Sequence, residues 1–185
     1  MNVFVLSTGR CGSTTFERAC RHIRNYTSGH ETRAGILGKG RLAYPPNHIE
    51  SDNRLAWFLG RLERQFPRDV FYVHLRREPM AVARSYARRL QPGMIMPAYA
   101  RGIYLGLQGG LETDALAVAL DYVDTVTANI EAFLRGRDNG LTVHLETVSD
   151  DFPRFWQAIG AEGDLAAALA EFRINYNADR GERPA

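Results

Sequence analysis

The opening of the chain constrains the fold more than any other stretch of the sequence. Residues 2–7 form an apolar, strand-like run, and a loop of glycines and hydroxyls then leads into a helical pattern that is expected to be capped by Ser13 or Thr14 and to continue to about Asn25. A loop between a strand and a helix presents backbone N–H groups and the positive end of the helix dipole to an anion. The sequence therefore predicts an anion-binding loop at the carboxyl end of the first strand.

This loop contains the residue types that an anion site uses. Gly9 and Gly12 let an anion approach the backbone, and Arg10 can place a positive charge beside it. The simpler alternative is that a glycine turn and a serine cap only start a helix, but the preceding strand favours the anion site. The candidate anion site also includes a thiol inside the loop, Cys11, and three hydroxyl donors at the helix start, Ser13, Thr14 and Thr15.

The loop lacks the ending G-x-x-x-x-G-K-[ST] of loops that bind nucleoside triphosphates. A magnesium-dependent kinase would also need a carboxylate at the end of a neighbouring strand. The next apolar run, residues 69–75, ends instead in Arg76 and Arg77, which would repel magnesium and attract a second anionic group. We therefore expect a nucleotide with an additional phosphate and a transfer that uses no metal. A P-loop small-molecule kinase is the first alternative.

Strand-like and helix-like segments alternate along the rest of the chain. Such alternation indicates a mostly parallel sheet with helices on both faces, and ligands bind such sheets at the carboxyl ends of the strands. With 45% hydrophobic residues and no linker, residues 1–185 are expected to form a single three-layer α/β domain with a P-loop-like phosphate-binding loop. The expected elements are strands at 2–7, 69–75 and 141–146 and helices at 13–25, 52–66, 79–90 and 113–135, with two short helices in the tail.

Residues 26–50 are expected to form a long loop, because they are rich in Gly, Pro, His and Asn. Loops longer than about 15 residues in a compact domain are usually functional or disordered, so an acceptor site is sought here. Trp57, Phe58 and Trp156 are expected in the core. A second Gly- and Pro-rich passage contains Met94, Met96, Tyr99 and Tyr104. These side chains are expected either to line an acceptor pocket or to belong to a surface loop.

The segment HLRREPMAVARSYA, residues 74–87, supplies a second candidate anion site. Arg77 stands at a strand end, Pro79 suits the first turn of a helix, and Ser85 lies two turns into that helix. The guanidinium and the hydroxyl can then converge on one phosphate. The alternative is that Arg77 is a solvated loop residue and Ser85 a tolerated small residue of the helix.

Together the two segments resemble the sulfotransferases that use 3′-phosphoadenosine 5′-phosphosulfate (PAPS). The family's 5′-phosphosulfate loop, [KR]-x-G-[ST]-[ST], is matched by residues 10–14, and its 3′-phosphate motif, an arginine with a serine eight positions later, is matched by Arg77 and Ser85. A third stretch, residues 143–160, is similar to the family's segment after a core strand, with Glu146 at the acidic position. The resemblance implies PAPS as sulfuryl donor, PAP as product and no metal.

The resemblance also implies an in-line transfer of the sulfuryl group to a hydroxyl or amine of an acceptor. Arg10 would stabilise the leaving 5′-phosphate, and a histidine or glutamate from the region between the two motifs would be the base. Glu31 is the first choice and His48 the second, with His30 and Glu50 as further candidates. Each could equally be a polar loop residue.

Other features narrow the class of protein. The first residues lack the composition of a signal peptide and no run of about 18 apolar residues occurs, so we expect a cytoplasmic protein without a membrane span. The sequence contains no strand motif that combines aromatic and basic residues, so we do not expect a nucleic acid partner. The expected partner is a small-molecule or glycan acceptor. In place of the family's C-terminal segment R-K-G…G-x-W-K, only NADRGERPA is found here, so the resemblance implies a nucleotide site that is either open or covered by a partner chain, as in a homodimer. A non-catalytic nucleotide-binding module is the second alternative.

Overall fold

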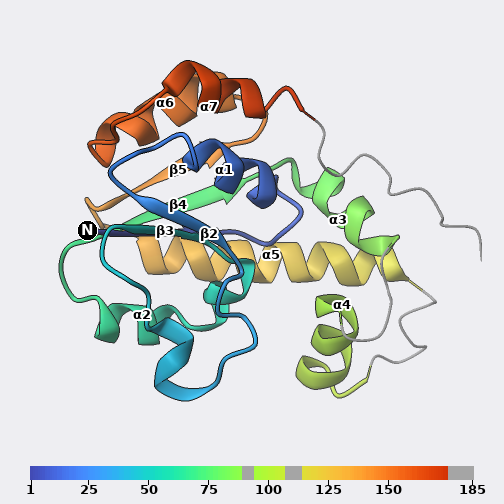
Figure 1. The fold of residues 1–185 in the computed structure, drawn as a ribbon. Helices are drawn as coiled ribbons and strands as arrows, with labels where there is room; N and C mark the ends of the chain where they lie inside the picture. Colours follow the sequence, from blue (N-terminus) through green and yellow to red (C-terminus); the bar gives the residue numbers. More distant parts are fainter. Residues whose placement is uncertain (89–93, 107–113, 175–185) are drawn as a thin grey trace, which may run out of the picture.

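A five-stranded parallel sheet forms the centre of the molecule in the computed structural model, which describes residues 1–88, 94–106 and 114–174 (Figure 1). The strand order is β2-β3-β1-β4-β5, and every neighbouring pair is parallel. All five strands therefore end at the same edge. The strands are β1 (Asn2–Leu6), β2 (Thr27–His30), β3 (His48–Ser51), β4 (Val70–Arg76) and β5 (Gly140–His144).

Helices cover both faces of the sheet. In Figure 1, α1, α6 and α7 lie above it and α5 lies below it, with α3 packed on α5. None of the helices in the described parts of the chain combines the length and apolar character that crossing a bilayer requires. The helices are α1 (Ser13–Cys20), α2 (Leu59–Gln65), α3 (Pro79–Ala87), α4 (Ile95–Ala98), α5 (Ala115–Leu134), α6 (Val148–Ala158) and α7 (Leu165–Glu171), with 3₁₀ turns η1 (Gly38–Leu42) and η2 (Asn53–Trp57) and a π-helical turn η3 (Tyr99–Ile103).

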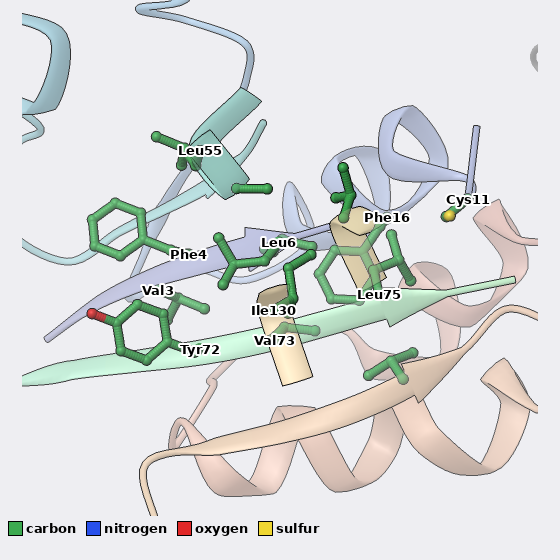
Figure 2. Packing of buried hydrophobic residues seen from close by; sticks show 14 of the residues in the cluster. Val3, Phe4, Leu6, Cys11, Phe16, Leu55, Tyr72, Val73, Leu75 and Ile130 are labelled. Atoms are coloured by element: carbon green, nitrogen blue, oxygen red, sulfur yellow. The ribbon is translucent and has the colours of Figure 1, made fainter. Parts of the chain in front are cut away.

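The core is built around β1, whose five residues are all buried (Figure 2). Phe4 and its register partner Tyr72 on β4 are covered by Phe66 and Phe133, with ring centroids 4.8 and 5.1 Å apart respectively. On the opposite face, Phe16 of α1 packs against two phenylalanines of α6. Because β1 is sandwiched in this way, the loop that follows it starts from a fixed point.

The expected long loop over residues 26–50 is wrong, because this segment contains the strands β2 and β3. Their sequences, TSGH and HIES, lack the apolar pattern by which a buried strand is recognised. The polar side chains are instead satisfied locally. Ser28 donates to the buried carboxylate of Glu17 at 3.1 Å, and His48 lies 2.9 Å from Glu50. The sheet consequently has five strands where three were expected.

The helical boundaries differ from the expected ones in two places. The first helix ends at Cys20, and the pattern at 52–66 divides at Phe58 into η2 and α2. Trp57 is 40% exposed, so its expected place in the core is wrong, whereas Trp156 is buried as expected. The expected end of the helix at residue 90 lies outside the described residues. The long helix α5, the start of α3 at Pro79 and the two tail helices agree with the prediction.

Acid should destabilise the fold through His74, a buried residue of β4. Burial lowers the pKa of His74 to about 4, and the charges of Arg76 and His144 act in the same direction. The unfolded chain, with a pKa near 6.5, therefore binds more protons than the folded chain between pH 4 and 6.5, so stability falls as the pH falls through this window. We expect His74 to lower the free energy of unfolding by about 2 kcal/mol when the pH falls from 7 to 5.

The measurement is urea unfolding of the wild type and His74→Gln at both pH values. Glutamine carries no charge at either pH, so the variant should lose about 2 kcal/mol less stability than the wild type on going to pH 5. Equal losses in the two proteins would contradict the prediction.

Candidate active site

A cavity of about 640 Å³ lies at the edge of the sheet where the strands end. The last residue of each strand, or the segment that follows it, contributes to its lining. Parallel strands with helices on both faces leave their carboxyl ends open to a ligand in this way. The contributions of β1 to β5, in that order, are Gly9, His30, Arg54, Arg77 and Leu145.

The backbone of the loop after β1 is shaped for an anion. Gly9, Arg10 and Gly12 all have left-handed conformations, with φ of 80°, 58° and 82°. Gly12 is the N-cap of α1, and no side chain caps this helix end, which corrects the expected cap at Ser13 or Thr14. The first N–H groups of a helix have no intrahelical acceptor. Here they meet the cavity together with Ser13 and Thr14.

Two buried tyrosines hold the start of this loop. The carbonyl oxygen of Thr8 accepts hydrogen bonds from Tyr86 on α3, at 2.7 Å, and from Tyr122 on α5, at 3.0 Å. Burial raises the pKa of Tyr86 strongly and that of Tyr122 to about 12, so both hydroxyls stay protonated and donate. A Cβ atom on Gly9 would overlap the Tyr86 hydroxyl. Glycine is therefore required here by both its backbone angle and the lack of space.

The structure brings the second anion motif to the same loop. Arg77, at the end of β4, donates from Nη1 to the carbonyl oxygen of Arg10 at 3.3 Å. The Nε of Arg10 donates to Ser85 on α3 at 3.0 Å. No ion pair within residues 1–88, 94–106 and 114–174 involves Arg77. Its guanidinium thus lines the cavity without an ion pair to any carboxylate of the described residues.

Positive charge dominates the cavity. Among the described residues, four arginines line it, against a single carboxylate, that of Glu31. Glu31 forms an ion pair with Arg54 at 2.9 Å, which places both at the cavity wall. Across the parts of the chain that the structure describes, no group of three or more His, Cys, Asp or Glu side chains is arranged around a metal position. The four arginines are Arg10, Arg54, Arg77 and Arg173.

The four candidate bases are divided by the structure into two pairs. His30 and Glu31 line the cavity, and His30 Nε2 lies 3.0 Å from the hydroxyl of Ser13 at the start of α1. His48 and Glu50 are buried, point toward each other, and do not reach the cavity. Glu50 also accepts hydrogen bonds from the backbone N–H and hydroxyl of Thr32, both at 2.7 Å. Their contacts are those of a buried network between β2 and β3.

Known proteins were compared with the sequence and with the fold. No protein-family model and no curated protein matches the sequence. The fold is similar to that of mouse sulfotransferase SULT7A1 complexed with PAP, with a TM-score of 0.59 and 12% identity over 98% of this chain and 68% of that chain. A sulfotransferase from Alicyclobacillus acidocaldarius gives a TM-score of 0.58 and 12% identity, over 93% of this chain and 94% of that chain. The chain has the sulfotransferase fold.

Cys11 and Thr15, two of the residues predicted at the anion-binding loop, are largely buried in this sulfotransferase fold. Cys11 is buried behind the loop, 3.2 Å from both the Thr8 hydroxyl and the Gly9 carbonyl. Burial raises the pKa of Cys11 to about 11, so it is a neutral thiol that supports the loop. Thr15 lines the cavity although it is largely buried.

Sequence reasoning missed several residues of this sulfotransferase-fold cavity. Asn53 and Arg54 follow β3 directly, and they would have been expected at the site had β3 been recognised. Phe172 and Arg173 come from the end of α7, where no local pattern signals a site. The missed cavity residues also include Tyr86, Leu145 and Val148.

A single methyl group at Gly9 should distort the loop. We expect Gly9→Ala to lower the free energy of unfolding by about 2–4 kcal/mol, from the left-handed backbone and the overlap with Tyr86. Tyr86→Phe removes the overlapping oxygen, so the double variant should be more stable than the sum of the single changes predicts, by about 1–2 kcal/mol. Thermal or urea unfolding of the four proteins gives this coupling.

The matched control is Gly60→Ala in α2, where a Cβ meets nothing within 4 Å. This change should be neutral or stabilise the helix by up to about 1 kcal/mol. Strict additivity of Gly9→Ala and Tyr86→Phe would contradict the proposed overlap.

Proposed function

We propose that this chain transfers a sulfuryl group from PAPS to a hydroxyl of an acceptor, by an in-line displacement without a metal. The observation that carries the proposal is the meeting of two anion-binding elements at one loop, where Arg77 contacts the backbone at Arg10, and Arg10 contacts the buried Ser85. The similar fold of a sulfotransferase crystallised with PAP supports it. PAPS carries phosphate at both ends of its ribose, and this arrangement offers a separate site for each.

The donor fits the residues that are present. We place its 5′-phosphosulfate at Gly9–Ser13, where the helix N-terminus and Arg10 offer N–H donors and positive charge. We place its 3′-phosphate beside Arg77 and Ser85 at the end of β4. A cavity of about 640 Å³ is in the usual range for a ligand of this size.

His30 is the general base in this proposal. It lies against Ser13, at the end of the cavity where the sulfuryl group would be, and can accept the proton of the acceptor hydroxyl. The acceptor oxygen then forms its bond to sulfur while the bond between sulfur and the 5′-phosphate oxygen breaks. Arg10 and the first N–H groups of α1 stabilise the negative charge that develops on that phosphate.

The two bases favoured from sequence take other roles in the proposal. Glu31 is a positioning residue, since its carboxylate holds Arg54 at 2.9 Å. His48 stabilises the pair β2–β3 through its contacts with Thr27 and Glu50, at 2.8 and 2.9 Å. The choice of His30 thus depends on access to the cavity and on the partner that each of the other candidates already has.

PAP binding measured by calorimetry tests the nucleotide site. We expect PAP to bind without added metal, and Arg77→Ala to weaken binding by about 1.5–3 kcal/mol, the cost of losing a hydrogen bond to a charged group. Arg84→Ala is the matched control, because Arg84 is exposed on α3 next to Ser85 and the variant loses the same charge. It should bind PAP nearly as well as the wild type.

The same titration with ATP and magnesium tests the alternative function. Binding of ATP with magnesium, together with no binding of PAP, would refute the proposal in favour of a phosphoryl-transfer protein. Equal effects of Arg77→Ala and Arg84→Ala would show that only net charge matters, and would remove the 3′-phosphate assignment.

Turnover tests the base. We expect His30→Gln to lower kcat by about 10²–10⁴-fold while PAP still binds, since general bases contribute about this much. Transfer of labelled sulfate from PAPS is measured with 2-naphthol and with N-acetylglucosamine as separate acceptors. Glu31→Gln and His48→Gln should retain more activity than His30→Gln. If Glu31→Gln loses activity and His30→Gln keeps it, the base is Glu31.

A further inference from the structure

A second, smaller cavity of about 310 Å³ adjoins the first. The two cavities share Arg54 and Ile95 in their linings, so they meet at these two residues. Its walls come from η2 on one side and from α4 and the π-helical turn η3 on the other. Single π-helical turns are rare and often occur at functional sites. The proposed function gives no role to this cavity.

The lining of the small cavity is mostly apolar, and three of the described residues in it are aromatic. The rings of Trp57, Phe58 and Tyr99 form part of its walls, and most of the remaining residues are aliphatic. Trp57 is 40% exposed and Ile103 is 56% exposed, although both are large apolar side chains. Exposed apolar groups gathered around a hollow mark a binding site more often than isolated ones do.

The polar groups of the small cavity already have partners. Arg41 is buried and forms an ion pair with Asp52 at 2.6 Å. Arg54 is paired with Glu31, as described above. No carboxylate or amide side chain of the described residues lines the cavity. A sugar ring, with a hydroxyl on nearly every carbon, would find few groups to replace its hydrogen bonds with water.

The hydroxyl of Tyr99, a residue of the cavity lining, is bonded to side chains of α5. The hydroxyl donates to the carboxylate of Asp121 on α5 at 2.6 Å and lies 3.1 Å from the hydroxyl of Thr125. Tyr104 donates to the same Asp121 oxygen at 2.7 Å. These hydrogen bonds attach η3 to α5, so this wall of the cavity is preformed. The tyrosine hydroxyls are already bonded to α5.

We propose that this cavity binds the acceptor and that the acceptor is a phenol of one or two aromatic rings. The inference rests on the proposed sulfotransferase function and extends it to the class of acceptor. Aromatic walls favour a flat aromatic body, which stacks or packs edge to face. The shared residues Arg54 and Ile95 lie between the cavities, so the acceptor hydroxyl can extend past them toward His30 in the larger cavity.

The direct test is calorimetry on the full chain saturated with PAP. 2-Naphthol is the aromatic probe, N-acetylglucosamine the sugar probe and 1-octanol the aliphatic one. We expect 2-naphthol to bind, and to bind more tightly than 1-octanol, while N-acetylglucosamine does not bind. Preferential binding of the sugar or the aliphatic alcohol, or no binding of 2-naphthol, would overturn the inference.

A pair of matched variants locates the binding site. Ala98 is an exposed alanine that lines the small cavity, and Ala128 is an exposed alanine on α5 that lines neither cavity. Ala98→Trp fills the small cavity and should weaken 2-naphthol binding by at least about tenfold, whereas Ala128→Trp should leave it unchanged. PAP should bind both variants as it binds the wild type. Equal 2-naphthol binding by both variants would overturn the assignment.

The outcomes separate the inference from the function on which it rests. If the wild type binds PAP but not 2-naphthol, the acceptor assignment fails and the nucleotide assignment stands. If the wild type does not bind PAP, the proposed function fails, and the acceptor assignment fails with it. If Ala98→Trp loses PAP binding while Ala128→Trp keeps it, the small cavity belongs to the nucleotide, which also overturns the inference.

Discussion

The carbonyl oxygen of Thr8 accepts two hydrogen bonds from buried tyrosine hydroxyls, and the shape of the site depends on this interaction. Tyr86 and Tyr122 come from α3 and α5, so the start of the loop is fixed to two helices as well as to β1. The same Tyr86 hydroxyl fills the space beside Gly9 and excludes any larger residue there. Because α3 also carries Ser85, the helix that shapes the loop positions a member of the second anion motif as well.

The sequence predicted the parts of the site that lie next to strongly apolar strands. β1 and β4 are mostly apolar, so the loop at Gly9–Ser13 and the arginine that follows β4 were predicted at the carboxyl edge of the sheet, where both lie. The strands β2 and β3 were missed because both are made mostly of polar residues, and those of β3 are buried in pairs such as His48 with Glu50, which hydrophobic periodicity cannot detect. The partner of Glu31, Arg54, was missed for the same reason, since it follows β3.

The two cavities divide the chemistry of the proposed reaction by polarity. The larger one is lined by four arginines and helix N–H groups, which suit a donor with several negative charges. The smaller one is lined by rings and aliphatic groups, and its two guanidinium groups are bound to carboxylates. Arg54 belongs to both linings. Its ion-pair partner Glu31 lines the larger cavity alone, so this pair holds a cation at the boundary between the two cavities.

The position of β1 at the centre of the sheet affects how the chain can fold during synthesis. β1 is made first, yet its two neighbours, β3 and β4, are completed only at Ser51 and Arg76. Until then, its five buried residues present an apolar strand with two open edges, the kind of segment that pairs with other chains. A ribosome that pauses before residue 76, or a truncation there, would leave this strand without one of its edges covered, which makes early chain termination an aggregation hazard for this protein.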